Sequence, residues 1–198
     1  MARPREFDEE EVLTRAMGQF WSAGYALTSV ADLERATGLG RKSFYNAFGN
    51  KRTLFLAALD LFASICGERY LAAMEAEDAG LAEVESVMRR MVADREGENG
   101  ENGCLICHTS REPIADEPEV KQRVDSYFSR IEKAFHGAIG RELERRRRPD
   151  SPADELAAFM TGVLISVSLL ARTPLEQDLL VNYLEQSLTH LGSRIDST

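Results

Sequence analysis

The chain of 198 residues is 29% charged and 43% hydrophobic with a mean hydropathy of -0.30, which excludes a disordered chain and allows one or two domains with a substantial core. Its formal net charge of -9 is unevenly divided: residues 1–55 hold eight basic and seven acidic residues, and the remainder holds 16 basic and 26 acidic ones. The acidic excess therefore excludes the later part of the chain as a nucleic-acid surface. No uninterrupted apolar run reaches the ~18 residues that span a bilayer, the N-terminus lacks a secretory signal, and three cysteines form no disulfide framework. We therefore expect a cytoplasmic protein that does not contact membranes.

A short basic segment and an amphipathic helix begin the chain. Arg3 and Arg5 could reach phosphate or a minor groove, or they could belong to an unordered tail. From Asp8 to Ala23, apolar residues recur at helical spacing and indicate a face that packs on a core. That face contains Val12, Leu13, Ala16, Met17, Phe20 and Trp21.

The next stretch, residues 28–55, has the pattern of a helix-turn-helix. Residues 29–36 have helical periodicity, and either Thr28 or Ser29 could be the N-cap. Residues 37–40 break the helix, because the two glycines among them tolerate a tight turn. A second helix is predicted over residues 41–48, the one that enters the DNA major groove in this motif. Its polar face suits base edges and phosphate oxygens and contains Arg41, Lys42, Ser43, Tyr45 and Asn46.

The run Tyr45-x-x-Phe48-Gly49-Asn50-Lys51-x-x-Leu54 then leads into a long helix. Together with the helices before it, this run resembles the DNA-binding domain of the tetracycline-repressor-like (TetR) transcription regulators over about the first 60 residues. The resemblance implies an all-α homodimer of about nine helices per chain. It implies a three-helix helix-turn-helix domain at residues 1–50 and a helical ligand-binding and dimerisation domain at residues 51–198. It also implies that Lys51 contacts the DNA backbone.

The residues expected to bind DNA combine this resemblance with the polar face of the second helix. They are Arg3, Arg5, Thr28, Ser29, Arg41, Lys42, Ser43, Tyr45, Asn46 and Lys51.

Beyond the helix-turn-helix, helices are expected from Asn50 to about Ala76 and from Leu81 to about Arg95. Between Gly97 and Gly103, a doubled Gly-Glu-Asn unit has nothing to bury and is expected to form a mobile loop. Large apolar residues of this second domain are candidates for lining an effector pocket, although for any single one an ordinary core position is the simpler interpretation. The candidates are Phe62, Tyr70, Met74, Met88, Met91, Tyr127, Phe128 and Phe135.

Cys104-Leu105-Ile106-Cys107-His108 is the second stretch that could carry chemistry. It matches the C-x-x-C-H string of c-type haem attachment, but that attachment requires export and no secretory signal is present. A thioredoxin-like redox motif is not favoured either, because no βαβ pattern surrounds the stretch. Three interpretations stay open: buried structural thiols, a thiol sensor, and a metal site formed by Cys104, Cys107 and His108 with a further ligand such as Cys66 or His136. Metal is not favoured, and no other cofactor is expected.

The segment Gly103-Cys104-Leu105 through Glu112 to Pro118 resembles a Gly-Cys-Leu element found in one TetR subgroup. Some members of that subgroup sense electrophiles, oxidants or metals through cysteine, and in others the cysteine is structural. The resemblance therefore favours a sensor without deciding between the interpretations.

Three helices complete the chain, the first from about Asp116 to Arg148. Its four consecutive arginines, 145–148, are interpreted as last-turn cations that offset the helix dipole before Pro149. Two more helices are expected, from Asp150 to about Arg172 and from Pro174 to about Leu191. In the family that the chain resembles, the last two helices form the dimer interface, and the residues expected there are Phe159, Val163, Val167, Leu170, Leu180, Tyr183, Leu184 and Leu188.

No nucleophile elbow, zinc-protease motif, P-loop or Rossmann fingerprint is present, so an enzyme is not expected. The expected function is a DNA-binding transcriptional regulator, favoured as a repressor, released by a small-molecule, thiol-reactive or metal effector. Its expected partners are double-stranded operator DNA, a second copy of the chain and the effector. The alternative is a helical ligand-binding or dimerisation protein that does not bind DNA.

Overall fold

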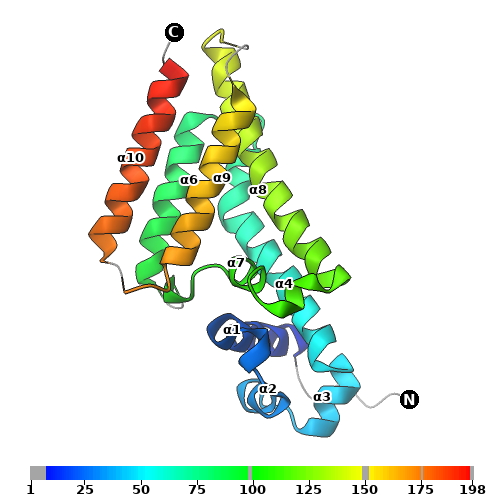
Figure 1. The fold of residues 1–198 in the computed structure, drawn as a ribbon. Coiled ribbons are helices and arrows are strands. Elements are labelled where there is room, and N and C mark those ends of the chain that lie inside the picture. Colours follow the sequence, from blue (N-terminus) through cyan, green and yellow to red (C-terminus); the bar gives the residue numbers. More distant parts are fainter. Residues whose placement is uncertain (1–7, 98–99, 149–151, 175, 197–198) are drawn as a thin grey trace.

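The computed structural model describes residues 8–97, 100–148, 152–174 and 176–196. These residues form ten α-helical segments and no strand, and because α4 and α5 join into one rod, they make nine separate helices. The predicted all-α fold is therefore confirmed. Figure 1 shows a small group of helices, α1–α3, below a larger bundle, with α4 passing from one to the other. We call α1–α3 the head and the helices from α5 onward the body.

The head consists of α1 (Glu9–Leu27), α2 (Val30–Thr37) and α3 (Arg41–Phe48). A capping box between Ser29 and Asp32 begins α2, and Gly38, at a φ of +74°, ends it in the left-handed conformation that glycine adopts readily. Together with the first turns of α4, the head encloses a core of fully buried side chains. These are Phe20, Leu33, Phe44, Leu54 and Phe55.

Helix α1 is longer than predicted and is broken at Gly24, whose φ is +80°. The helical turn resumes at Tyr25 and ends at Thr28, which is 1% exposed and donates its hydroxyl proton to the Gly24 carbonyl at 2.7 Å. Thr28 therefore closes α1, and its buried side chain is not offered to DNA as the sequence analysis expected. The N-cap of α2 is Ser29.

The long helix that leaves the head is α4 (Lys51–Cys66), continued by a π-helical turn (Gly67–Leu71) and by α5 (Ala72–Glu75). The side chain of Asn50 accepts a hydrogen bond from the Thr53 N–H at 2.8 Å and fixes the start of α4. The helix packs on α1 in the head and on α7 and α8 in the body. One rod therefore carries both groups of helices.

The body contains α6 (Leu81–Ala93), α7 (Leu105–Thr109), α8 (Pro118–Arg145), α9 (Ala153–Leu170) and α10 (Gln177–Asp196). Short 3-10 turns lie at Asp94–Glu96, Gly100–Asn102 and Pro113–Asp116. Of the loop expected to be mobile, residues 98–99 lie outside the described part, and Gly100–Asn102 forms a turn whose glycine approaches the backbone of residues 94 and 95. The short α7 lies between α1 and the bundle (Figure 1).

Helix α9 is long and apolar enough to cross a membrane, by length and composition only, with a mean hydropathy of 1.6 over 18 residues. Acidic and small polar residues interrupt its sequence, so it contains no long uninterrupted apolar run. Helices α8 and α10 pack against α9, yet only 39% of its residues are buried. The chain therefore leaves part of an apolar helix uncovered.

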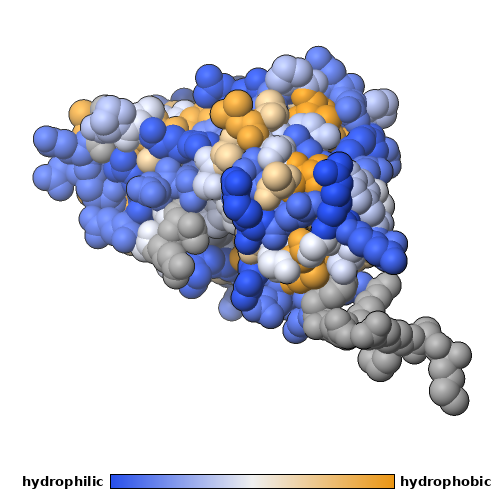
Figure 2. Space-filling model, turned by 90° about the horizontal axis from the view of Figure 1, so that it is seen from below, coloured by the Kyte–Doolittle hydropathy of each residue, from blue (hydrophilic) through white to orange (hydrophobic). Residues whose placement is uncertain are grey.

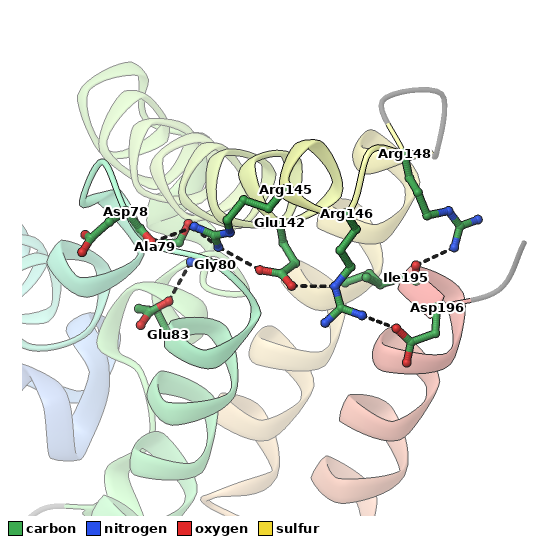
Figure 3. A network of polar contacts seen from close by, with 10 residues as sticks. All are labelled: Asp78, Ala79, Gly80, Glu83, Glu142, Arg145, Arg146, Arg148, Ile195 and Asp196. Atoms are coloured by element: carbon green, nitrogen blue, oxygen red, sulfur yellow. Dashed lines mark hydrogen bonds and ion pairs between the residues drawn. The ribbon is translucent and has the colours of Figure 1, made fainter.

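The arginine run at the end of α8, residues 145–148, ties together the end of the bundle that lies farthest from the head (Figure 1 and Figure 3). Arg145 donates to the carbonyls of Asp78 and Ala79, Arg146 pairs with Glu142 and Asp196, and Arg148 donates to the Ile195 carbonyl. These arginines therefore satisfy carbonyls beyond α5 and at the end of α10, in addition to closing their own helix.

The same end of the body gives a test of stability. Arg141 donates to the carbonyls of Met74 at 2.8 Å and Ala79 at 3.0 Å from a partly buried position. Arg141→Met should lower the free energy of unfolding by about 1–3 kcal/mol, because the Met74 carbonyl loses its side-chain donor and the Ala79 carbonyl keeps only the longer bond from Arg145 at 3.4 Å. Urea denaturation followed by circular dichroism measures the change, and the exposed Arg194→Met serves as control, with a change of less than about 0.5 kcal/mol. Equal stability of the two variants would contradict the assignment.

Candidate nucleic-acid interface and effector cavity

The outer face of α3 is polar and exposed. Phe44 is fully buried on the inner side and anchors the helix to the head core. Arg41, Lys42, Ser43, Tyr45 and Asn46 all face solvent. Within the described part of the chain neither Arg41 nor Lys42 forms an ion pair, and the Arg41 guanidinium lies 5.9 Å from the centre of the Tyr45 ring. The face that was expected to read DNA is therefore available to a partner.

Figure 2 views the molecule from the head end. Hydrophilic residues cover most of this surface, and hydrophobic residues form small patches between them. Leu27 is the most exposed large apolar side chain of the described residues, at 82%. Arg3 and Arg5, predicted to contact DNA, lie outside the described residues.

Two further predicted DNA contacts flank this face. The Ser29 hydroxyl is engaged in the α2 cap, accepting from the Asp32 N–H at 3.2 Å and donating to the Asp32 carboxylate at 2.6 Å. Lys51 is half-buried at the start of α4, with its Nζ 4.0 Å from the centre of the Tyr25 ring. Burial lowers the pKa of Lys51, and the Glu112 and Asp32 carboxylates act in the opposite direction.

A cavity of about 500 Å³ lies at the junction of head and body. Five predicted residues line it, namely Phe62, Tyr70, Met91, Cys104 and Tyr127. Met17 and Trp21 of the head also line it, as do Ile65, Cys66, Arg69, Asp94, Val167, Ser168 and Ala171. The spacing of Met17 and Trp21 predicts only a core-facing helix, because no local pattern shows that α1 meets the body.

The other predicted pocket residues lie elsewhere. Met74, Met88 and Phe135 are fully buried core residues, and Phe128 is a half-buried residue packed against the same core. None of the four lines this cavity, so the prediction is corrected for it, and Met74 lines a second hollow along α5 and α8 instead. Helical spacing identifies residues that face inward, but it does not distinguish a packed interior from a hollow one.

A larger hollow of about 660 Å³ lies along α5 and α8. Its walls are mainly polar and include Arg130, whose guanidinium is already paired with Glu75 at 2.7 Å. The smaller cavity, with aromatic and apolar walls and few polar groups, has the character of a small-molecule site.

The three cysteines differ in their surroundings. Cys104 begins α7, and its Sγ accepts the Cys107 N–H at 3.4 Å and lies 3.8 Å from the Tyr127 hydroxyl oxygen. Burial alone raises the pKa of the Cys104 thiol, but hydrogen bonding with Cys107 and Tyr127 outweighs it and leaves the pKa below its ordinary value. Burial, and next the proximity of Cys104, raise the pKa of Cys66 to about 12. Hydrogen bonding with Cys104, and next burial, raise the pKa of Cys107.

Cys104, Cys107 and His108 do not converge on one point. Cys104 lines the cavity, Cys107 is buried in the core, and His108 lines a separate cleft at the head–body junction with Arg111 and Arg172. In the described part of the chain no three His, Cys, Asp or Glu side chains are arranged to hold a metal ion. The geometry therefore does not support the metal interpretation.

The predicted dimer residues lie on the expected helices, mostly on the opposite face. Val163, Val167, Leu180, Leu184 and Leu188 are each at most 5% exposed, so they belong to the core of their own chain and that part of the prediction is corrected. Phe159 and Tyr183 are exposed, and Leu170 is half-buried. The uncovered stripe of α9 and α10 consists of Phe159, Gly162, Ser166, Leu179, Tyr183 and His190.

Comparison with known proteins finds relatives along almost the whole chain. Residues 12–58 match the family model "Bacterial regulatory proteins, tetR family". The chain is 31% identical over 170 residues to the HTH-type transcriptional repressor DhaR of Mycobacterium sp. (strain GP1), covering 82% of this chain and 83% of DhaR. It is 26% identical over 193 residues to the HTH-type transcriptional regulator YezE of Bacillus subtilis (strain 168), covering 96% and 100%.

Among solved structures, the fold is similar to a cysteine mutant of the TetR family transcriptional regulator CifR in complex with a 26-base-pair operator DNA. The TM-score is 0.80 at 26% identity, over 95% of this chain and 98% of that one.

The thiol environments lead to a test of reactivity. At neutral pH, N-ethylmaleimide should modify Cys104 before Cys66, because only the thiolate reacts and the pKa of Cys104 is lowered whereas that of Cys66 is raised to about 12. The rate at Cys104 should rise with pH and level off above its lowered pKa, while the rate at Cys66 should still be rising at pH 10. Peptide mass spectrometry between pH 6 and 10 follows both rates, with Cys104→Ser as control. Faster labelling of Cys66 at pH 7 would overturn the prediction.

Proposed function

The chain belongs to the TetR family of bacterial regulatory proteins, and from this premise we propose that it is a repressor that binds its operator as a homodimer and leaves it when a small molecule occupies the cavity. It is a DNA-binding regulator rather than an enzyme. In the proposal, residues 1–50 form the DNA-binding domain and residues 51–198 the regulatory and dimerisation domain.

The exposed polar face of α3 is the observation that carries the proposal. Five adjacent hydrogen-bonding or cationic side chains project from a helix whose opposite side is fixed in the head core. Guanidinium and carboxamide groups such as those of Arg41 and Asn46 pair with base edges in the major groove. Lys51 at the start of α4 supplies a cation for the phosphate backbone. CifR, a relative with a similar structure, is bound to operator DNA.

The uncovered stripe on α9 and α10 supports dimerisation. Phe159 and His190 rings meet at 5.2 Å on the outside of the protomer, beside the small residues Gly162 and Ser166. Small residues allow two helices to approach closely, and apolar surface of this kind marks an interface. The second copy places a second α3 at a fixed distance, as a two-part operator requires.

The cavity determines what kind of molecule can release the protein. Its inner wall is formed by aromatic and apolar side chains such as Trp21, Phe62 and Met91, and its polar groups Arg69, Tyr70 and Asp94 are already bonded to one another. We infer a compact, largely apolar effector with few polar atoms, since the walls offer few unpaired partners. It must bind the DNA-free state more tightly than the DNA-bound state.

A thiol-reactive effector is the second candidate, because Cys104 faces this cavity with a lowered pKa. This candidate agrees with the resemblance of Gly103-Cys104-Leu105 to the subgroup element in which some members sense electrophiles. An electrophile would alkylate Cys104 and remain inside the cavity as its adduct, so both candidates act by filling the same space.

The DNA contacts are tested by separating base from phosphate recognition. Operator duplexes are selected from a randomised pool, and affinities are measured by fluorescence anisotropy at several salt concentrations. Arg41→Ala and Asn46→Ala should each weaken the binding free energy by about 1–3 kcal/mol for duplexes that carry the preferred base pair at one position. Each substitution should also reduce the discrimination between base pairs at that position. Lys51→Ala should weaken all duplexes alike and reduce the salt slope by about 1. Lys121→Ala, on the body, removes the same charge and is the control. If the wild-type protein binds no duplex, the alternative is favoured, namely a helical ligand-binding or dimerisation protein that does not bind DNA.

The dimer is tested at Gly162, where an added side chain meets no atom within 4 Å in the protomer. Gly162→Glu should leave the protomer folded, because glutamate favours helix more than glycine does, and should disrupt the stripe. Sedimentation equilibrium should give the 22.1 kDa monomer for this variant and twice that mass for the wild type. Gly140→Glu on α8, equally free of contacts within 4 Å, should remain dimeric. A dimeric Gly162→Glu protein would exclude this face as the interface.

A further inference from the structure

The break in α1 exposes backbone groups that the body satisfies. Directly after the non-helical Gly24, the Glu112 carboxylate accepts hydrogen bonds from the N–H groups of Tyr25 and Ala26, at 3.2 and 2.9 Å. Glycine is required at position 24 for two reasons: its φ is +80°, and a Cβ there would lie 3.1 Å from a Glu112 carboxylate oxygen. Glu112 lies 86 residues from Ala26 in the chain, between α7 and α8.

Two further bonds hold the same part of α1. The Trp21 indole N–H donates to the Gly103 carbonyl at 2.9 Å, and Arg172 donates to the Ser22 carbonyl at 2.7 Å. Residues 21–26 of the head are therefore tied to three separate positions of the body.

One of these three positions lies at the effector cavity and two lie beside it in the chain. Gly103 lines the cavity, whereas Arg172 and Glu112 line the separate cleft at the head–body junction. The chain connects them to the cavity, because Ala171 and Cys104 line it, and Glu112 ends the segment that starts at Gly103. Trp21 itself lines the cavity and meets the Phe62 ring at 5.2 Å. An occupant of the cavity cannot enter without contact with the wall that anchors α1.

We propose that Glu112 and Trp21 are positioning residues that couple the cavity to the head, through α1 and the segment Gly103–Glu112. Filling the cavity displaces this segment, the Glu112 carboxylate withdraws from the broken end of α1, and the head changes its orientation. This inference rests on the proposed function for its meaning, but the displacement is measurable without DNA. It assigns the signal to α1, a route distinct from the rod formed by α4.

The test fills the cavity in two independent ways. N-ethylmaleimide is attached to Cys104, with the adduct verified by mass spectrometry, and Ala171→Phe fills the space without any reagent. Hydrogen exchange then reports on the Tyr25 and Ala26 amides. Both fillings should accelerate exchange at these two amides at least tenfold, while amides within α10 remain unchanged. Protection that persists in both filled proteins would overturn the proposal.

The coupling itself is measured with operator DNA. In the wild type, filling should change the operator dissociation constant by a factor in the range of about 5–150 that is usual for allosteric coupling. The double variant Trp21→Phe and Glu112→Gln keeps an aromatic ring at position 21 and the side-chain size at position 112. In this variant, filling the cavity should change the operator dissociation constant by a factor below about 3. Glu132→Gln, an exposed carboxylate on α8, is the control and should behave as the wild type.

If these side chains were merely structural, the double variant would change stability or overall affinity. Filling the cavity would then still change the operator dissociation constant by the same factor as in the wild type, and that result would contradict the proposal. If no protein, filled or unfilled, binds DNA, the proposed function fails, and the amide exchange still decides whether the cavity controls α1.

Discussion

One rod, α4 with α5, runs through a single hydrophobic core that joins head and body, and this constraint governs the molecule. Near the start of α4, the Phe55 ring packs edge-on against Phe20 of the head at 5.0 Å, and two turns later Phe62 packs against Trp21 at 5.2 Å. Cores are packed as densely as organic crystals, so these rings cannot slide gradually past one another. Head and body can therefore change their relation only by moving between discrete packed arrangements, which is the property that a regulatory switch needs.

The head was predictable because its determinants are local. The glycines at 38 and 40, the polar N-cap residues Ser29 and Asn50, and the apolar residue at 44 act within a few residues, where propensity and capping rules apply. The exposed face of α3 follows directly from the burial of Phe44. The contact at the end of the Gly-Glu-Asn stretch was not predictable for the opposite reason: the local composition gives no sign that the Gly103 carbonyl would accept a bond from Trp21, 82 residues earlier.

The body was predictable in outline and not in detail. Helical periodicity placed α8, α9 and α10 correctly, but α9 is apolar on nearly all sides, so no pattern distinguishes the face toward its own chain from the face toward a second copy. Most of the residues predicted for the dimer interface therefore lie on the inner face of their own chain. Likewise, the side chains of Met88 and Met91 are chemically alike, and only the packing shows that one is core and the other lines a cavity.

The π-helical turn at Gly67–Leu71 has a consequence for the register of the rod. An additional residue within one turn rotates everything after it by roughly 100°, because an α-helix has about 3.6 residues per turn. In a regular helix Cys66, which lines the cavity, and the buried Met74, eight residues later, would lie about 80° apart around the axis. The additional residue brings them to roughly the same side of the rod. A chain of this kind that lacked one residue in this turn would rotate the side chains after it around the helix axis. It would present a different set of them to its effector, and its DNA-reading helix would be unchanged. Ligand preference can therefore diverge among relatives through this rotation alone.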